Sequence, residues 1–146
     1  MASGLPPCKR HIATHDANGK SVYAEFKPQS YTKAGEAGFI ARSWSVANVP
    51  AKLDGDEDMK AYFAGPESAT SFQRAEIVVP SEGGKNNGAN LVVVDLNPGF
   101  YSQMHQTVSI DYSICVIGTI IHELDGGERV TLKPGVCSLL QEPGNH

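Results

Sequence analysis

The sequence has no long hydrophobic run, which argues against a protein that crosses a membrane by helices. Its most apolar stretches are short and β-branched, such as Leu91-Val92-Val93-Val94, whereas a spanning helix needs roughly 20 apolar residues. The opening residues, MASGLPPCKRH, also lack the apolar region of a secretory signal. We therefore predict a cytoplasmic protein that does not act at a membrane.

Cysteines are few, and basic charge is not concentrated anywhere. The three cysteines form no Cys-x-x-Cys pair, which is typical of free thiols in a reducing compartment. Lysine and arginine number 12 against 16 acidic residues, for a formal net charge of −4. A dense basic stripe that could neutralise phosphates is missing, so we exclude nucleic acid as the main partner. The sequence also lacks a Gly-rich phosphate loop, a Gly-x-Ser-x-Gly elbow and a His-Glu-x-x-His motif.

Short segments rich in β-branched and aromatic residues, separated by turn residues, are what the sequence does contain. They predict an all-β barrel or sandwich within one structural domain, with residues 1–37 as an N-terminal arm and hairpin and residues 38–146 as the barrel. One short helix is expected over Asp56–Phe63, and Asp125-Gly-Gly127 predicts a hairpin turn. The expected strands are Arg10–Thr14, Ser21–Phe26, Gly38–Val49, Phe72–Val79, Leu91–Leu96, Gln103–Val116, Thr119–Leu124, Arg129–Leu132 and Cys137–Gln141.

The stretch from Pro98 to Gly118 holds the residues best suited to chemistry. If Gln103–Val116 is one strand without a bulge, residues of equal parity point to the same face. That face would carry His105, Thr107, Asp111 and Cys115. His146, at the end of the last predicted segment, would bring a second imidazole to the same cavity.

The spacing of these residues resembles the first motif of the cupin superfamily, in which His-x-His is followed by Glu and later by Gly. His105 stands at the first histidine, Thr107 where the second histidine is usual, Asp111 at the glutamate and Gly118 at the closing glycine. The resemblance implies a jelly-roll β-barrel.

The second cupin motif is matched in part. Gly135 begins it, Gln141-Glu142-Pro143 stands where Pro-x-Gly is usual, and His146 stands at the histidine. The amino-acid sequences of both segments are similar to those of small stand-alone cupins that accompany secondary-metabolism enzymes. This resemblance implies tailoring of a small molecule such as a polyketide. A cupin barrel normally continues past this histidine, and the sheet edge that a short end would leave predicts a homodimer.

Three functions remain open. In the first, His105 and Asp111 are an acid–base pair for dehydration, decarboxylation, isomerisation or cyclisation, which is lyase or isomerase chemistry without a cofactor. In the second, His105, Asp111 and His146 hold one Fe, Mn or Zn ion, although cupin sites usually offer three histidines and a glutamate. In the third, the barrel binds a small ligand without turnover.

Further residues are candidates for binding a small-molecule substrate. Arg42 shares strand parity with Trp44, and its guanidinium suits either a substrate carboxylate or, equally, a structural acidic residue. Tyr101 and Gln103 share parity with His105, and Thr107 and Cys115 belong to its predicted face. For Cys115, a small buried core residue is preferred over a catalytic thiolate, which would need an adjacent base. His11, His15 and His122 are interpreted as surface or strand-pairing histidines.

Overall fold

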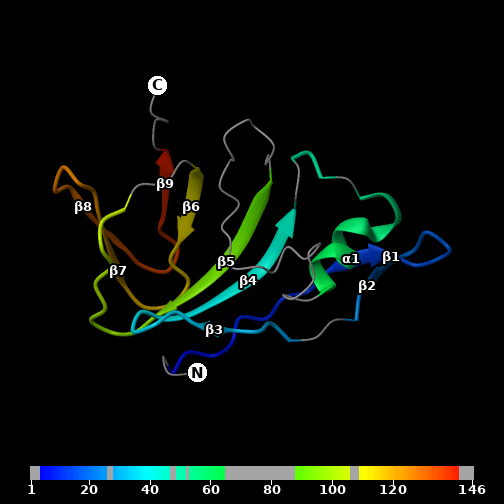
Figure 1. Ribbon diagram of the computed structural model, residues 1–146, viewed down its shortest axis with the longest axis horizontal. Coiled ribbons are helices and arrows are strands. Elements are labelled where there is room, and N and C mark those ends of the chain that lie inside the picture. Colours follow the sequence, from blue (N-terminus) through cyan, green and yellow to red (C-terminus); the bar gives the residue numbers. More distant parts are fainter. Residues whose placement is uncertain are drawn as a thin grey trace. The chain divides into compact units, whose positions relative to one another are not determined.

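The computed structural model of this chain describes residues 4–25, 28–46, 49–51, 53–64, 88–105 and 109–141. These residues are mostly strands, with one 3-10 turn and one short helix, so the predicted all-β class is confirmed (Figure 1). Within these ranges, neither helix has the length and apolar character needed to cross a bilayer. The elements are β1 (Ala13–His15), β2 (Ser21–Tyr23), β3 (Thr32–Lys33), β4 (Gly38–Val46), η1 (Asp54–Asp56), α1 (Glu57–Phe63), β5 (Ala89–Leu96), β6 (Ile110–Ile114), β7 (Ile120–Glu123), β8 (Arg129–Leu132) and β9 (Cys137–Gln141).

The chain divides into two compact units, which we describe separately. The first unit contains the described residues up to 64 together with residues 88–101, and the second contains residues 102–105 and 109–141. The expected division into an arm (1–37) and a barrel (38–146) stays a prediction.

In the first unit, β3, β4 and β5 form an antiparallel sheet. The register of β4 against β5 passes from the Arg42–Val92 pair to the Trp44–Leu91 pair, so Ser43 is the extra residue of a β-bulge. At the other end of β4, Gly38 has φ +136°, and a Cβ there would lie 2.0 Å from the backbone oxygen of Asp95. Only glycine fits this close approach of two strands.

The core of the first unit lies where α1 packs on β4. Tyr62 of α1 is 3% exposed, and its ring stacks on Trp44 with 4.7 Å between centroids. Arg10 of the N-terminal segment donates from Nη1 to the Ser43 carbonyl (2.6 Å) and to the Tyr62 hydroxyl. The bulge places the Ser43 carbonyl outside the regular pairing, and Arg10 satisfies it. This network fixes the N-terminal segment to both β4 and α1.

The second unit consists of two antiparallel pairs, β6 with β9 and β7 with β8. The β7–β8 connection is the predicted hairpin: Leu124 and Glu128 close it with a backbone hydrogen bond of 2.9 Å, and Gly127 takes φ +87°. Glycine reaches this left-handed conformation without strain. The structure therefore confirms the hairpin that the residue types of this turn predicted.

Most predicted elements are confirmed, although several differ in their bounds. β1 covers Ala13–His15 where Arg10–Thr14 was expected, and β2 ends at Tyr23 where Ser21–Phe26 was expected. The helix begins at Glu57, one residue later than expected, and β3 was not predicted. The long strand Gln103–Val116 is wrong: residues 101–105 have no regular structure, and β6 begins at Ile110. The expected strand Phe72–Val79 lies outside the described residues.

Candidate functional site

His105 lies in the irregular segment before β6, in the second unit. Its ring is exposed, and its Nδ1 is 3.1 Å from the backbone oxygen of Gln103. A carbonyl oxygen only accepts hydrogen bonds, so Nδ1 carries the proton in this contact. In the neutral ring this leaves the lone pair on Nε2, which is then the atom able to accept a proton or a metal.

Asp111 lies on β6 and is half-buried. It pairs with Leu140 of β9, and both of its carboxylate oxygens accept a hydrogen bond from the Ser109 hydroxyl, at 3.1 and 3.2 Å. A carboxylate held in this way is a suitable acceptor for a protonated imidazole or a ligand for a hard cation. The expectation that Asp111 and His105 lie on the same face of one strand does not hold, because residues 101–105 are not part of a strand.

The remaining predicted residues of this segment are placed as follows. Tyr101 is 74% exposed in the first unit, and Gln103 is exposed in the second, with its carbonyl bound to His105. Thr107 and His146 lie outside the described residues. Their assigned roles stay predictions.

Arg42 and Trp44 lie on either side of the bulge in β4. Trp44 is in contact with the rings of Tyr62 and Phe63. The backbone carbonyl of Arg42 accepts a hydrogen bond from the Tyr62 hydroxyl. Burial lowers the pKa of the Arg42 guanidinium below its usual value, because loss of water disfavours the charged form. The contacts of Trp44 belong to the core between β4 and α1, and substrate binding by either residue stays a prediction.

A cavity of about 210 Å³ lies on the second unit and is open to solvent, since Ile114 and Ile121 of its lining are 66% and 64% exposed. Its polar lining residues are Ser102, Ser113 and His122, and its apolar lining residues are Ile114, Ile120, Ile121 and Leu132. Cys115 also lines it and is 4% exposed. Its thiol lies 3.7 Å from the backbone oxygens of both Ile117 and Gly118, so Cys115 has the expected burial and faces the cavity.

His122 is the cavity residue that the sequence analysis missed. It is half-buried on β7, and its Nδ1 is 3.3 Å from the hydroxyl of Ser138 on β9. This contact joins the two sheets of the second unit. The available signal was the apolar neighbour two residues earlier, Ile120, which lines the same cavity and shares the strand face of His122.

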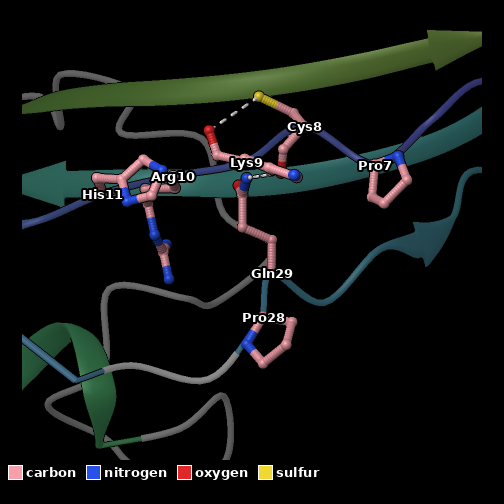
Figure 2. Close-up of a pocket in the computed structure, with 7 residues that line it drawn as sticks. All are labelled: Pro7, Cys8, Lys9, Arg10, His11, Pro28 and Gln29. Carbon is pink, nitrogen blue, oxygen red and sulfur yellow. Dashed lines mark hydrogen bonds between the residues drawn. The ribbon is translucent and has the colours of Figure 1, made fainter.

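A second hollow, of about 290 Å³, lies in the first unit between the N-terminal segment and Gln29 (Figure 2). Gln29 donates to the Cys8 carbonyl at 2.9 Å. In Figure 2 the Cys8 sulfur and the Arg10 guanidinium point to opposite sides of the chain, so this cation does not lie over the thiol. The hollow therefore does not show the paired thiolate and cation of a reactive cysteine.

The predicted metal site can be tested only in part against the structure. Among the described ranges, no three His, Cys, Asp or Glu side chains are grouped to hold a metal ion. Two of the three predicted ligands, His105 and Asp111, are described. Their donors fit a divalent transition metal in kind, since an imidazole whose other nitrogen binds a carbonyl is the usual form of a metal-bound histidine.

Comparison with known proteins covers nearly the whole chain. No family model matches it. The cupin-domain-containing oxidoreductase fogC of Aspergillus ruber is 28% identical over 139 residues, which is 94% of this chain and 62% of that protein. The cupin-domain-containing oxidoreductase virC of Hypocrea virens is 28% identical over 140 residues, or 94% and 65%. Phomopsin biosynthesis cluster protein C' of Diaporthe leptostromiformis is 31% identical over 139 residues, or 94% and 67%. The chain thus spans less than two thirds of the length of fogC and virC.

Proposed function

The chain belongs to the cupin-domain proteins of secondary-metabolite biosynthesis clusters, and on this premise we propose that it is a tailoring enzyme that modifies a small molecule by acid–base chemistry. The observation that carries the proposal is the hydrogen bond from His105 Nδ1 to the Gln103 carbonyl. It orients an exposed imidazole with Nε2 as its basic atom, which is the arrangement that proton transfer requires.

His105 Nε2 is the proposed base. It removes a proton from a carbon next to a carbonyl group of the substrate. The protonated ring then returns the proton, either to another carbon, which gives an isomer, or to a hydroxyl group, which leaves as water. Asp111 would stabilise the imidazolium during this step, and its two contacts with Ser109 hold the carboxylate in place.

A second candidate is metal-dependent redox chemistry, favoured by the names of fogC and virC, which are both called oxidoreductases. His105 through Nε2, Asp111 through its carboxylate and His146 would be the ligands. A bound Fe ion would supply a redox centre with positions open to substrate. In this candidate the Gln103 carbonyl orients the ligating imidazole instead of a base.

The test compares the metabolite that accumulates when the gene is deleted with the product formed from it by the purified protein. Acid–base chemistry gives an isomer, or a product that has lost water or carbon dioxide. Redox chemistry gives a product that has lost or gained a pair of hydrogens, or gained oxygen. Mass spectrometry of the two compounds distinguishes these outcomes directly.

Metal content supplies an independent arm of the same test. The protein is purified without a tag or chelator and measured by elemental mass spectrometry. The acid–base proposal expects turnover that survives dialysis against a chelator. Near one equivalent of one transition metal, together with turnover that falls on chelation and returns with that metal, would replace it with the second candidate.

A further inference from the structure

The cavity of the second unit contains an imidazole that the proposed mechanism does not use. His122 on β7 lines it, opposite in chemical character to the apolar side chains of Ile120 and Leu132 in the same wall. Leu132 is 4% exposed, and it pairs with Ile120 across the β7–β8 hairpin. A half-buried polar ring among such neighbours fixes the orientation of a bound molecule in small-ligand sites.

The size of the cavity limits the ligand. Its volume is about 210 Å³. An engineered apolar cavity of roughly 150 Å³ holds a benzene ring, whereas sites for drug-sized ligands begin at roughly 300 Å³. Because the cavity is open to solvent, its volume limits the part of a ligand that it holds, which is one six-membered ring with a small substituent.

The orientation of the imidazole is set from outside the cavity. Ser138 Oγ on β9 lies 3.3 Å from His122 Nδ1, so Nδ1 is engaged and Nε2 is the ring nitrogen available to a ligand. A serine hydroxyl both donates and accepts, so either neutral tautomer keeps this contact. His122 Nε2 can consequently donate to a carbonyl oxygen or accept from a phenolic or enolic hydroxyl.

We propose that this cavity binds a single oxygenated ring, a phenol or a cyclic enone, with His122 hydrogen-bonded to its oxygen and Ser138 holding the His122 ring. The apolar side chains cover the carbon face of the ligand. Ser138 is a positioning residue, since it acts through His122. The inference rests on the proposed function in taking this ring to be part of the substrate, but its test measures binding and requires no turnover.

The experiment uses phenol and toluene as probes. Phenol carries a hydroxyl group on the ring where toluene carries a methyl group. Their dissociation constants are measured by ligand-observed NMR on the full chain. The readout is the preference for phenol, which is the ratio of the phenol affinity to the toluene affinity. Burial favours the methyl group of toluene over a hydroxyl, so the hydrogen bond is measured by the change in this ratio between variants. Loss of one net hydrogen bond in His122→Phe should lower the preference for phenol by about three- to tenfold, while toluene still binds. Ser138→Ala should leave an intermediate preference.

Two further variants locate the binding. Ser113→Phe places a large ring in the cavity wall and should abolish binding of both probes. His15→Phe removes an exposed histidine of β1 in the first unit and should leave the preference unchanged. Circular dichroism confirms that each variant is folded. If His122→Phe does not fold, Ser138→Ala and Ser113→Phe still decide the matter.

Several results would overturn the inference. These are no binding of phenol by the wild-type protein, an unchanged preference for phenol in His122→Phe, toluene binding unaffected by Ser113→Phe, or an equal loss of preference in His15→Phe. An unchanged preference in Ser138→Ala would remove the positioning role of Ser138. None of these results alters the mass difference between substrate and product, so failure here is distinct from failure of the proposed function.

Discussion

The two units of the molecule use their polar side chains in different ways. In the first unit, buried polar groups bind one another: Ser43 Oγ donates to Gln29, and Ser45 Oγ donates to Asn90. In the second unit, the buried side chains of the described part are Cys115 and Leu132. Its two described imidazoles are exposed or half-buried, and each has one nitrogen engaged by a neighbour.

Under the proposed function, we expect the first unit to serve as a scaffold and the histidines of the second unit to carry the chemistry. The hydroxyls of Ser43 and Ser45 are hydrogen-bonded within the core of the first unit, where a lost partner costs free energy of folding. The rings of His105 and His122 are each held at Nδ1, so Nε2 is the nitrogen with which each would act on a substrate or ligand. Substitutions in the first unit should therefore change stability, and substitutions at the histidines of the second unit should change activity or binding.

The largest expected effect is the loss of turnover in His105→Ala. Removal of a general base typically slows a reaction by about a hundred- to ten-thousandfold. The conversion rate of the accumulated metabolite measures the effect, and circular dichroism verifies the fold. His15→Ala, which removes an exposed imidazole of β1, is the matched control and should retain the wild-type rate. A His105→Ala protein with wild-type turnover would remove chemistry from this segment.

Asp111→Asn should also lower turnover, because an amide neither supports an imidazolium nor ligates a hard cation well. Both Ser109 contacts involve a hydroxyl donor, and the amide oxygen can still accept one of them, so the local structure should persist. The rate and the thermal midpoint are measured together. Equal turnover in Asp111→Asn and wild-type protein would exclude Asp111 from the site under either candidate function.

The largest expected effect on stability is that of Gly38→Ala in the first unit. The new Cβ would lie 2.0 Å from the Asp95 backbone oxygen, at φ +136°. Backbone strain and overpacking together predict a loss of about 3 kcal/mol in the free energy of unfolding. Gly35→Ala is the matched control, since its φ is +56° but nothing lies within 4 Å of the added Cβ. Similar losses in both variants would show that strain alone, without the close approach to β5, accounts for the effect.

A smaller loss of stability is expected for Tyr62→Phe. The substitution keeps the ring stacked on Trp44 but removes the hydroxyl that accepts from Arg10 and donates to the Arg42 carbonyl. Loss of these two hydrogen bonds should cost about 1–2 kcal/mol in the free energy of unfolding, measured by urea unfolding. Tyr23→Phe, at a 73% exposed tyrosine, should cost much less. A stable Tyr62→Phe protein with lowered turnover would contradict the division between scaffold and chemistry.

The elements that could be predicted are those that depend on local chemistry. The β7–β8 hairpin follows from Asp125-Gly-Gly127, β5 from its β-branched run, and α1 from its acidic first turn. Each of these signals lies within the element itself or in its turn. Partner strands were not needed to recognise them.

The failures depend on partners that lie far away in the sequence. β6 pairs with the five residues of β9, Cys137–Gln141, which are matched by Ile110–Ile114. Residues 101–105 are not part of a strand, so the alternation of side chains along β6 does not extend to His105. The bulge at Ser43 is likewise a property of the register against β5. His122 was misjudged because its surroundings include Ser138 of another strand pair.

The smallest expected effect is that of Arg129→Ala in the second unit. Arg129 and Glu123 face each other across the β7–β8 hairpin at 3.0 Å, with side chains 64% and 23% exposed. Solvent and salt screen such a pair, so its loss should cost less than about 1 kcal/mol, and the cost should shrink further at high salt. Urea unfolding at low and high ionic strength measures both. A larger and salt-independent loss would mean that polar contacts stabilise the second unit as they do the first. The distinction between polar groups that stabilise the fold and polar groups that serve activity or binding would then fail.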